Sequence, residues 1–487
     1  MNYKKRILSI TAATALLAAA AVPALALENE FHGSLKVQFV NSNFNRVNGN
    51  GVGDYDFGTT KNRYSANYVE QRDRLQYTAK ANADLKLVTQ FELDYAYWGN
   101  SSYTVGRNSG GALGADSVNI ETKHIYLDAA PYKGVNLKLG MMPNNDAFKA
   151  ILFDADMAGA LASSSYGKFS PSIGYFRFND GSTSADKALG KRTNDLFMLD
   201  GKVEISKELK FGAAYYFFRD GQPTSTSTSV VTPAVPDTVI TVNDINNVPY
   251  QLTLPGTGSS AVTATTQNYN DIKIHALGLN AEYVQGPLTL NGFAVYETGW
   301  NNKRYTSAFA GNVGARLKAG TGTARAEFLY VTGEGGGTGR SNAFYAVDGE
   351  HGYYDNEMVI LGRDKNVCSA DTSLIYNAGN KGQGQIGGYL GYDLPVTDRL
   401  ATAFNVGFAA VAKENAAKPV NLMTGAANKS NYIGTEVNAE ANYKLMDNLK
   451  ASFRVGYVML GDYYKDVTIG GTPADPYDAK LIFKYTF

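Results

Sequence analysis

The chain has 487 residues, with 45 basic and 45 acidic side chains and therefore no formal net charge at pH 7. This balance argues against nucleic acid as a partner, because phosphate binding requires a concentrated basic surface. Tyr, Phe and Gly are abundant, at 33, 23 and 51 residues. Such a composition suits a protein with one face in lipid and one in water better than it suits a buried globular core.

Disulfide, metal and cofactor chemistry find little support in the sequence. Cys368 is the single cysteine, so no intramolecular disulfide can form, and no haem-attachment sequence is present. The four histidines, His32, His124, His275 and His351, are widely separated. No catalytic motif stands in the strand–helix context that it requires. We therefore expect no metal, no cofactor and no enzymatic activity.

Residues 1–26 are predicted to be a secretory signal peptide. A basic start precedes an apolar stretch, and Ala24-Leu25-Ala26 supplies a small-x-small cleavage site. Beyond it, no run approaches the roughly 18 apolar residues that a spanning helix requires. Residues 27–487 are predicted to form one domain that crosses a membrane as a closed barrel, the remaining way to satisfy backbone groups in lipid.

Polarity alternates with a period of two in nearly every segment between loops. In 435–445, for example, Glu436, Asn438 and Glu440 share one face, and Val437 lies on the other. Placing Lys or Arg against the middle of a bilayer costs about 2–4 kcal/mol. The charged face of each strand must therefore look into water.

The alternation predicts an all-β fold, an antiparallel transmembrane barrel with short periplasmic turns, long extracellular loops and both termini periplasmic. Eighteen strands are predicted, at 31–41, 72–83, 85–98, 119–130, 135–142, 157–166, 171–179, 193–205, 208–219, 270–284, 287–299, 306–318, 321–332, 384–393, 398–411, 432–446, 448–461 and 478–487. The segment 157–166 looks loop-like. If it and a neighbour are not strands, the count becomes sixteen.

The last predicted strand places Leu481, Phe483, Tyr485 and Phe487 on one face and ends on the phenylalanine. With the leader and the alternating hairpins, this pattern resembles that of Gram-negative outer-membrane porins over essentially the whole mature chain. The resemblance implies a location in the outer membrane in contact with its lipid, and assembly as a homotrimer. It also implies a water-filled channel crossed by passive diffusion of small hydrophilic solutes and ions.

Two alternatives to general diffusion stay open. The first is a substrate-selective channel. The second is a surface binding or structural barrel that acts through its long loops, of which 220–269 and 333–383 are the longest. Loops of this length are usually functional or disordered.

In porins the third extracellular loop folds inward and narrows the channel. By that resemblance, residues 143–156 are the constriction candidate. Its polar members are Asn144, Asn145, Asp146, Lys149, Asp154 and Asp156. The loop is short, which leaves open whether it reaches the centre of the pore.

Other charged residues are predicted to face the lumen, because they lie on the polar side of an alternating strand. They are Arg74, Lys80, Glu92, Asp94, Lys138, Arg177, Lys202, Arg316, Arg325, Glu436, Glu440 and Arg454. Charged side chains around a pore set its ion preference. Interspersed signs predict a hydrated and weakly selective lumen.

Overall fold

The structure of the protein is a computed structural model. It describes residues 27–44, 65–99, 111, 120–182, 186–232, 238–243, 249–254, 262–337, 339–347, 354, 356–364, 368, 373–468 and 470–487. The predicted signal peptide lies outside the described residues. Among them, no helix combines the length and the hydrophobicity needed to span a membrane.

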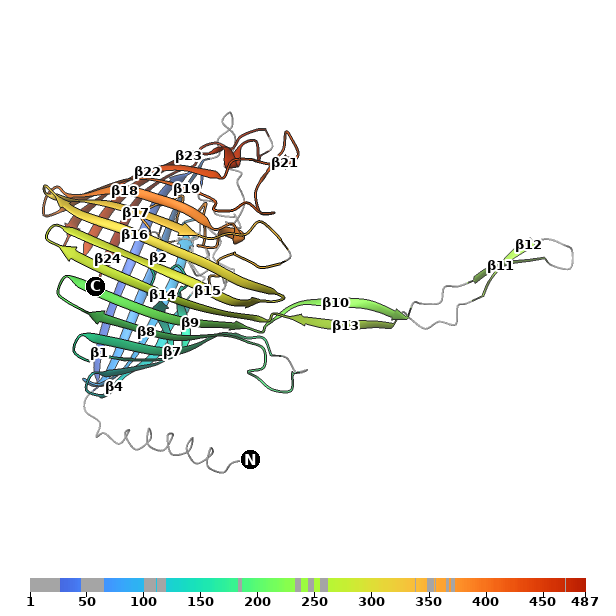
Figure 1. Cartoon of the computed structure of the whole chain (residues 1–487), viewed down its shortest axis with the longest axis horizontal. Helices are drawn as coiled ribbons and strands as arrows, with labels where there is room; N and C mark the ends of the chain where they lie inside the picture. Colours follow the sequence, from blue (N-terminus) through green and yellow to red (C-terminus); the bar gives the residue numbers. More distant parts are fainter. Residues whose placement is uncertain are drawn as a thin grey trace, which may run out of the picture.

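Eighteen strands form a single antiparallel sheet that closes on itself (Figure 1). Closure occurs at β1 (Glu28–Ser42), which pairs with β2 on one side and with the last strand, β24, on the other. The other barrel strands are β2 (Ala66–Asn82), β3 (Leu85–Tyr97), β4 (Ile120–Tyr132), β5 (Val135–Asn145), β6 (Asp154–Ser164), β7 (Phe169–Asp180), β8 (Thr193–Glu204), β9 (Leu209–Asp220), β14 (Ile272–Gln285), β15 (Leu288–Asn301), β16 (Arg304–Ala319), β17 (Gly322–Val331), β18 (Gln385–Pro395), β19 (Leu400–Ala410), β22 (Tyr432–Met446), β23 (Leu449–Leu460) and β24 (Tyr477–Thr486).

This architecture confirms the predicted all-β barrel and its strand number. Each of the eighteen predicted segments corresponds to one barrel strand. The uncertain segment 157–166 is β6, which pairs with β5 and β7. Sixteen strands is therefore the wrong count.

Short turns join the strands at the end of the barrel that holds the C-terminus, and long connections lie at the other end (Figure 1). The long connections contain short elements of their own. They are the hairpin of β10 (Pro223–Thr232) and β13 (Val262–Tyr269), the pairs β11 (Thr238–Asn243)–β12 (Pro249–Leu254) and β20 (Val420–Asn421)–β21 (Ala426–Ala427), and the 3₁₀ turns η2 (Asn380–Gly382) and η3 (Asp462–Tyr464). The hairpin β10–β13 extends away from the barrel beyond β9 and β14 (Figure 1).

The outer face of the barrel is apolar. The side chains of Leu277, Val313 and Leu390 are 60%, 59% and 61% exposed, although these residues lie within regular strands. On β14, Leu277 alternates with the fully buried Ile274 and Ala276. Large exposed apolar side chains around a closed sheet are the mark of a surface that faces lipid.

Arg177 is an exception among the predicted lumen-facing charges, because it lies on this outer face. On β7 it alternates with the buried Gly174 and Phe176 and shares its side with the exposed Tyr175. Its Nε donates to Asp195 Oδ1 on β8 at 2.9 Å. The prediction for Arg177 was therefore wrong, since β7 presents its apolar face inward.

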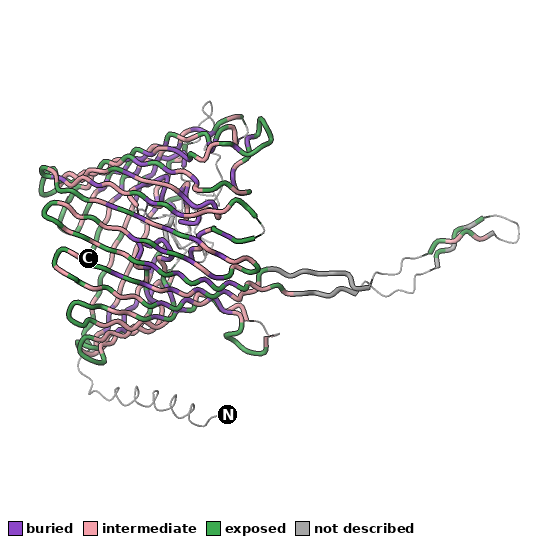
Figure 2. Tube along the Cα trace, viewed as in Figure 1, coloured by how far each residue is buried: buried purple, intermediate pink, exposed green. Residues whose placement is uncertain are grey.

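The interior is not uniformly wet, contrary to the prediction from alternation. Figure 2 shows that buried residues gather in the half of the barrel nearest the long loops. One apolar cluster joins β7–β9 and β14–β17 to residues 148–153, 344–347 and 354. A second joins β18, β19, β22 and β23 to residues 358–361. The inner wall is apolar where a loop packs against it.

A lysine introduced at the outer face should destabilise the barrel more than one introduced inside. Val437, 42% exposed in the middle of β22, faces lipid, whereas Gln90 of β3 faces the lumen. We expect Val437→Lys to lower the free energy of unfolding by about 2–4 kcal/mol, and Gln90→Lys to change it little. Urea unfolding in lipid vesicles measures both, and equal losses would contradict the assigned faces.

Candidate pore constriction

The segment Asp146–Phe153, between β5 and β6, folds into the barrel around one carboxylate. Asp146 Oδ1 accepts from the backbone N–H of Phe148 at 2.6 Å. Its Oδ2 accepts from Leu152 at 2.6 Å and from Phe153 at 2.9 Å. These bonds satisfy backbone donors that a turn inside a barrel would otherwise leave without partners.

Two aromatic residues anchor this turn to the wall. Phe148 packs edge-on against Tyr216 of β9, with ring centroids 6.0 Å apart, and lies 5.8 Å from Phe293 of β15. Phe153 packs against Tyr216 at 5.2 Å. A Cβ at Gly278 of β14 would approach the Phe148 ring to 2.3 Å, so glycine leaves the space that the ring occupies.

The turn reaches the far wall despite its shortness. Lys149 and Ala150 both have φ near +60°, a conformation that costs a non-glycine residue about 1–3 kcal/mol. It directs Lys149 Nζ to Glu327 Oε2 on β17, 2.8 Å away and eight strands further round the barrel. The sequence left open whether this loop spans the pore. In the structure it does.

Glu327 is also the meeting point of the second inward loop. It accepts a hydrogen bond from the Tyr354 hydroxyl, and from Asn312 Nδ2 at 3.1 Å and Tyr389 OH at 3.2 Å. Tyr354 N–H in turn donates to Ala150 O at 3.1 Å. One wall carboxylate thus holds both loops together.

The long insert 333–383, whose role the sequence did not determine, supplies this second loop. Its backbone is held by two fully buried carboxylates of the barrel wall. Glu297 of β15 accepts from Tyr345 N–H at 2.8 Å. Glu436 of β22 accepts from Val359, Ile360 and Leu361 N–H at 2.7, 3.0 and 2.7 Å. Glu436 was predicted to face the lumen, and it does so as an anchor rather than as a solvated charge.

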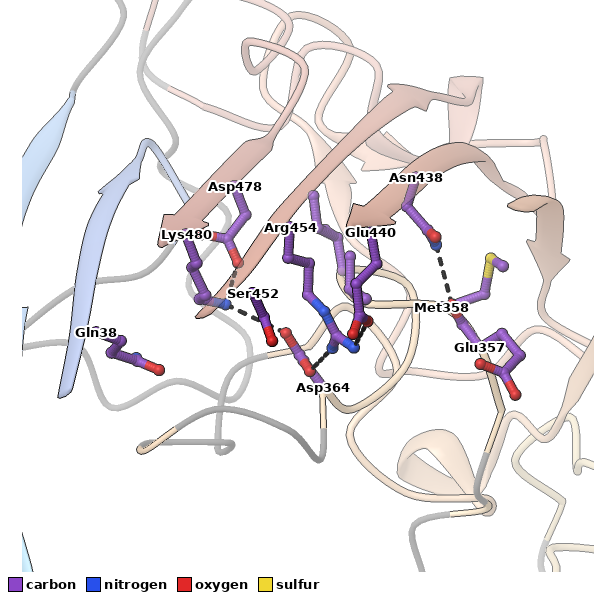
Figure 3. Close-up of polar contacts among 12 residues, drawn as sticks. Gln38, Glu357, Met358, Asp364, Asn438, Glu440, Ser452, Arg454, Asp478 and Lys480 are labelled. Atoms are coloured by element: carbon purple, nitrogen blue, oxygen red, sulfur yellow. Dashed lines mark hydrogen bonds and ion pairs between the residues drawn. The ribbon is translucent and has the colours of Figure 1, made fainter. Parts of the chain in front are cut away.

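A cluster of charges fixes the end of the same loop (Figure 3). Asp364 is buried and pairs with Arg454 of β23 and, at 3.5 Å, with Lys480 of β24. Arg454 also pairs with Glu440, and Lys480 with Asp478. The predicted lumen charges Glu440 and Arg454 therefore pair with each other, and Arg454 also pairs with Asp364, a loop residue that the sequence did not single out.

The other constriction candidates lie beside the turn rather than within it. Asn144 is half-buried, with Nδ2 3.2 Å from Met198 Sδ, and Asn145 is exposed at the end of β5. Asp154 begins β6, 3.9 Å from Arg363 of the second loop. Asp156 lies 2.7 Å from both Lys123 Nζ and His124 Nε2 of β4. Asp146 and Lys149 are the two candidates that shape the turn.

Most of the remaining predicted lumen charges are paired. Arg74 pairs with the buried Glu92, and Lys80 pairs with Glu30. Arg325 lies 2.7 Å from Asp393 and 3.0 Å from Glu357, a residue of the second loop. Lys138 lies over the Tyr126 ring at 5.5 Å. The side chain of Asp94, in β3, lies outside the part that the structure describes.

Lys202 and Arg316 line a cavity of about 770 Å³ beneath the Asp146–Phe153 turn. Lys149 and Asn280 also line it, and the ends of β8, β9, β14, β15 and β16 form its walls. These are the ends joined by short turns. The cavity is a polar vestibule on the periplasmic side of the constriction.

A row of basic residues, missed by the sequence reasoning, crosses five adjacent strands. Pairing places Lys444 opposite Lys450, Lys450 opposite Lys484, Lys484 opposite Lys36, and Lys36 opposite Arg72. These five residues are called the basic row below. It lies on the inner face. Lys444, Lys450 and Lys484 are closer to the periplasmic strand ends than Arg454, whereas Lys36 and Arg72 lie in the middle of β1 and β2. The turn Met446–Leu449 brings Lys444 and Lys450 together, so the hairpin alone could have revealed the first pair.

The closed sheet, its apolar outer band and its inward loops define the class: an outer-membrane β-barrel with the porin fold. Neither a protein-family model nor a curated protein matches the chain. Solved structures do match it over nearly its full length, among them *Acinetobacter baumannii* OccAB4, with a TM-score of 0.51, 12% identity, and 96% of this chain and 100% of that chain covered.

Two *Pseudomonas aeruginosa* proteins are similar at the same level. The outer membrane protein opdK has a TM-score of 0.51 and 10% identity, with 94% of this chain and 98% of that chain covered. The outer membrane protein OprD has a TM-score of 0.50 and 10% identity, with 96% and 95% covered. At these identities the likeness establishes the fold, which agrees with a location in the outer membrane.

Replacing Asp146 by asparagine should loosen the constricting turn. An amide offers one acceptor oxygen. Its NH₂ group would replace the second carboxylate oxygen and would face backbone N–H groups that now donate hydrogen bonds to that oxygen. We expect Asp146→Asn to raise single-channel conductance and its fluctuation in planar bilayers. Asn145→Ala, one residue away on an exposed side chain, is the matched control. Unchanged conductance in Asp146→Asn would show that the turn does not limit the pore.

The same carboxyl predicts a pH dependence. Burial raises the pKa of Asp146 from 3.8 to about 7, against backbone N–H donors that lower it. Between pH 3.8 and about 7, the docked turn holds a proton that the undocked turn has released. Docking is therefore strongest below pH 3.8 and weakens as the pH rises to about 7. Conductance should be larger at pH 8 than at pH 5. Asp146→Asn should lose this step, and a step retained in that variant would assign it to another group.

Proposed function

We propose that the protein is a substrate-selective outer-membrane channel for small anionic solutes. The observation that carries this proposal is the basic row, in which five positive side chains stand opposite one another around the inner wall. Like charges directly opposite each other destabilise a sheet. A passing anion would relieve that repulsion.

The availability of these charges supports the proposal. Within the described part of the chain, Lys450 and Lys484 form no ion pair, and both lie at the edge of the lumen on the periplasmic side. Arg72, at the end of the row, lies 3.5 Å from Glu92, which also pairs with Arg74. Most other lumenal charges are likewise matched by a partner. The equal numbers of basic and acidic residues therefore hide an uneven distribution of charge in the lumen. A solute in the lumen interacts with these local charges and not with the net charge.

The inward loops favour selectivity over general diffusion. Glu327, Glu436 and the Arg454–Asp364 pair hold two loops across the interior. A solute must pass the surfaces of these loops, and a narrow passage brings it within contact distance of the wall. General diffusion through a wide lumen remains the second candidate, favoured by the polar vestibule of about 770 Å³. Trimeric assembly stays a prediction that rests on the resemblance.

Removing the row should change ion preference. In a bilayer with a KCl gradient, we expect a reversal potential that reports preference for chloride, and a marked shift toward cations in Lys450→Gln/Lys484→Gln. Lys318→Gln, an exposed residue at the periplasmic end of β16, is the matched control. Cation preference in the unaltered protein would contradict the proposal. A complete absence of conductance would favour a surface binding or structural barrel.

A further inference from the structure

A second row of charged residues lies on the outer face of the barrel. The strand pairing places Arg177 opposite Asp195, Asp195 opposite Arg219, Arg219 opposite Lys273, and Lys273 opposite Trp300. Residues directly opposite each other in an antiparallel pair point to the same face. These five residues on β7, β8, β9, β14 and β15 are called the outer row below.

The outer row marks the extracellular edge of the lipid-facing band. Each member lies near the strand end that leads into a long connection or the turn after β15. The next row toward the periplasm is aromatic, with Tyr175, Phe197, Phe217 and His275 in register.

The row beyond it is largely apolar. Ile173, Leu199, Tyr215 and Leu277 follow in register on the same four strands. Polarity therefore falls in two steps from charged to aromatic to apolar. This is the order expected across the boundary between a headgroup layer and acyl chains.

The charge of the outer row is positive and accessible. Arg177 and Lys273 have side chains 41% and 50% exposed, and each pairs with one aspartate, Asp195 at 2.9 Å and Asp271 at 2.5 Å. Arg219 is exposed between them and forms no ion pair within the described residues. Asp195, opposite Arg219, already pairs with Arg177, so the row holds more positive than negative charge, and a guanidinium at the edge of a lipid phase is costly unless an anion accompanies it.

A further cation borders the row. Trp300 packs edge-on against Tyr305 of β16, with centroids 5.6 Å apart, and the Arg340 guanidinium lies 4.9 Å from the centre of the Tyr305 ring. Arg219 and Lys273 stand opposite each other on neighbouring strands, and Arg340 adds positive charge two strands beyond Lys273. Two of these are guanidinium groups, which bind phosphate in a bidentate manner.

We propose that the outer row binds the phosphate of an anionic glycolipid headgroup in the outer leaflet, with Arg219 and Lys273 as the central contacts. The aromatic row would lie against the sugar and the first part of the acyl chains, since ring faces pack against both. Basic clusters at the membrane boundary are the general means of holding anionic headgroups. This inference concerns the outer face and does not rest on the proposed transport function.

Native mass spectrometry of the full-length barrel in detergent provides the test. The probes are bisphosphorylated lipid A, the same lipid without phosphates, and inorganic phosphate. We expect the phosphorylated lipid to bind, the dephosphorylated lipid to bind at least about ten-fold more weakly, and Arg219→Gln/Lys273→Gln to lose a similar factor. Lys207→Gln, which removes an exposed charge in the short turn between β8 and β9, should bind like the unaltered protein.

Several outcomes would overturn the proposal. Equal binding of the two lipids would show that the acyl chains and not the phosphate are recognised. Equal retention of phosphorylated lipid by Arg219→Gln/Lys273→Gln, with an unchanged barrel by heat-modified gel mobility, would place the lipid elsewhere. Binding of inorganic phosphate as tight as that of the lipid would indicate an anion site without lipid recognition. A second copy of the chain that covers the outer row would make the row a subunit interface rather than a lipid site.

Discussion

The structure depends on one constraint: irregular backbone inside a barrel must find hydrogen-bond partners, and here inward-facing carboxylates provide them. Asp146 closes its own turn, whereas Glu297, Glu327 and Glu436 reach from the wall to the two loops. Charge-assisted bonds from backbone N–H groups are among the stronger hydrogen bonds in proteins. Asp146, Glu297 and Glu436 thus replace backbone pairing that the loops lack, and Glu327 holds both loops through their side chains, Lys149 and Tyr354.

This use of charge decides which residues remain for solutes. Arg454, which looks like a free lumenal charge in the sequence, pairs with both Glu440 and Asp364. Lys450 and Lys484 of the basic row keep their charge, because they form no ion pair within the part of the chain that the structure describes. One set of side chains therefore forms the constriction, and under the proposed function a different set selects the solute.

The two faces of the same strands are covered by different surroundings. Inside, β14 carries Ile274 and Ala276, buried because a loop covers them, and outside it carries Leu277, exposed because lipid covers it. Both faces are apolar at this height, which breaks the simple alternation. The outward position of Arg177 has the same origin, since Phe176 occupies the interior beneath the loop.

The sequence by itself predicted the barrel and eighteen strands, with sixteen left open, because a period of two and the chemistry of short turns are local properties of the chain. It also located the inward turn around Asp146 and Lys149, by resemblance. Only the tertiary structure decided that residues 344–347, 354 and 358–361 pack inside the barrel, that Glu327 joins two loops, and that Lys36, Lys450 and Lys484 share a row. Those facts depend on register between strands distant in the chain and on loops meeting across the lumen, and neither leaves a local pattern.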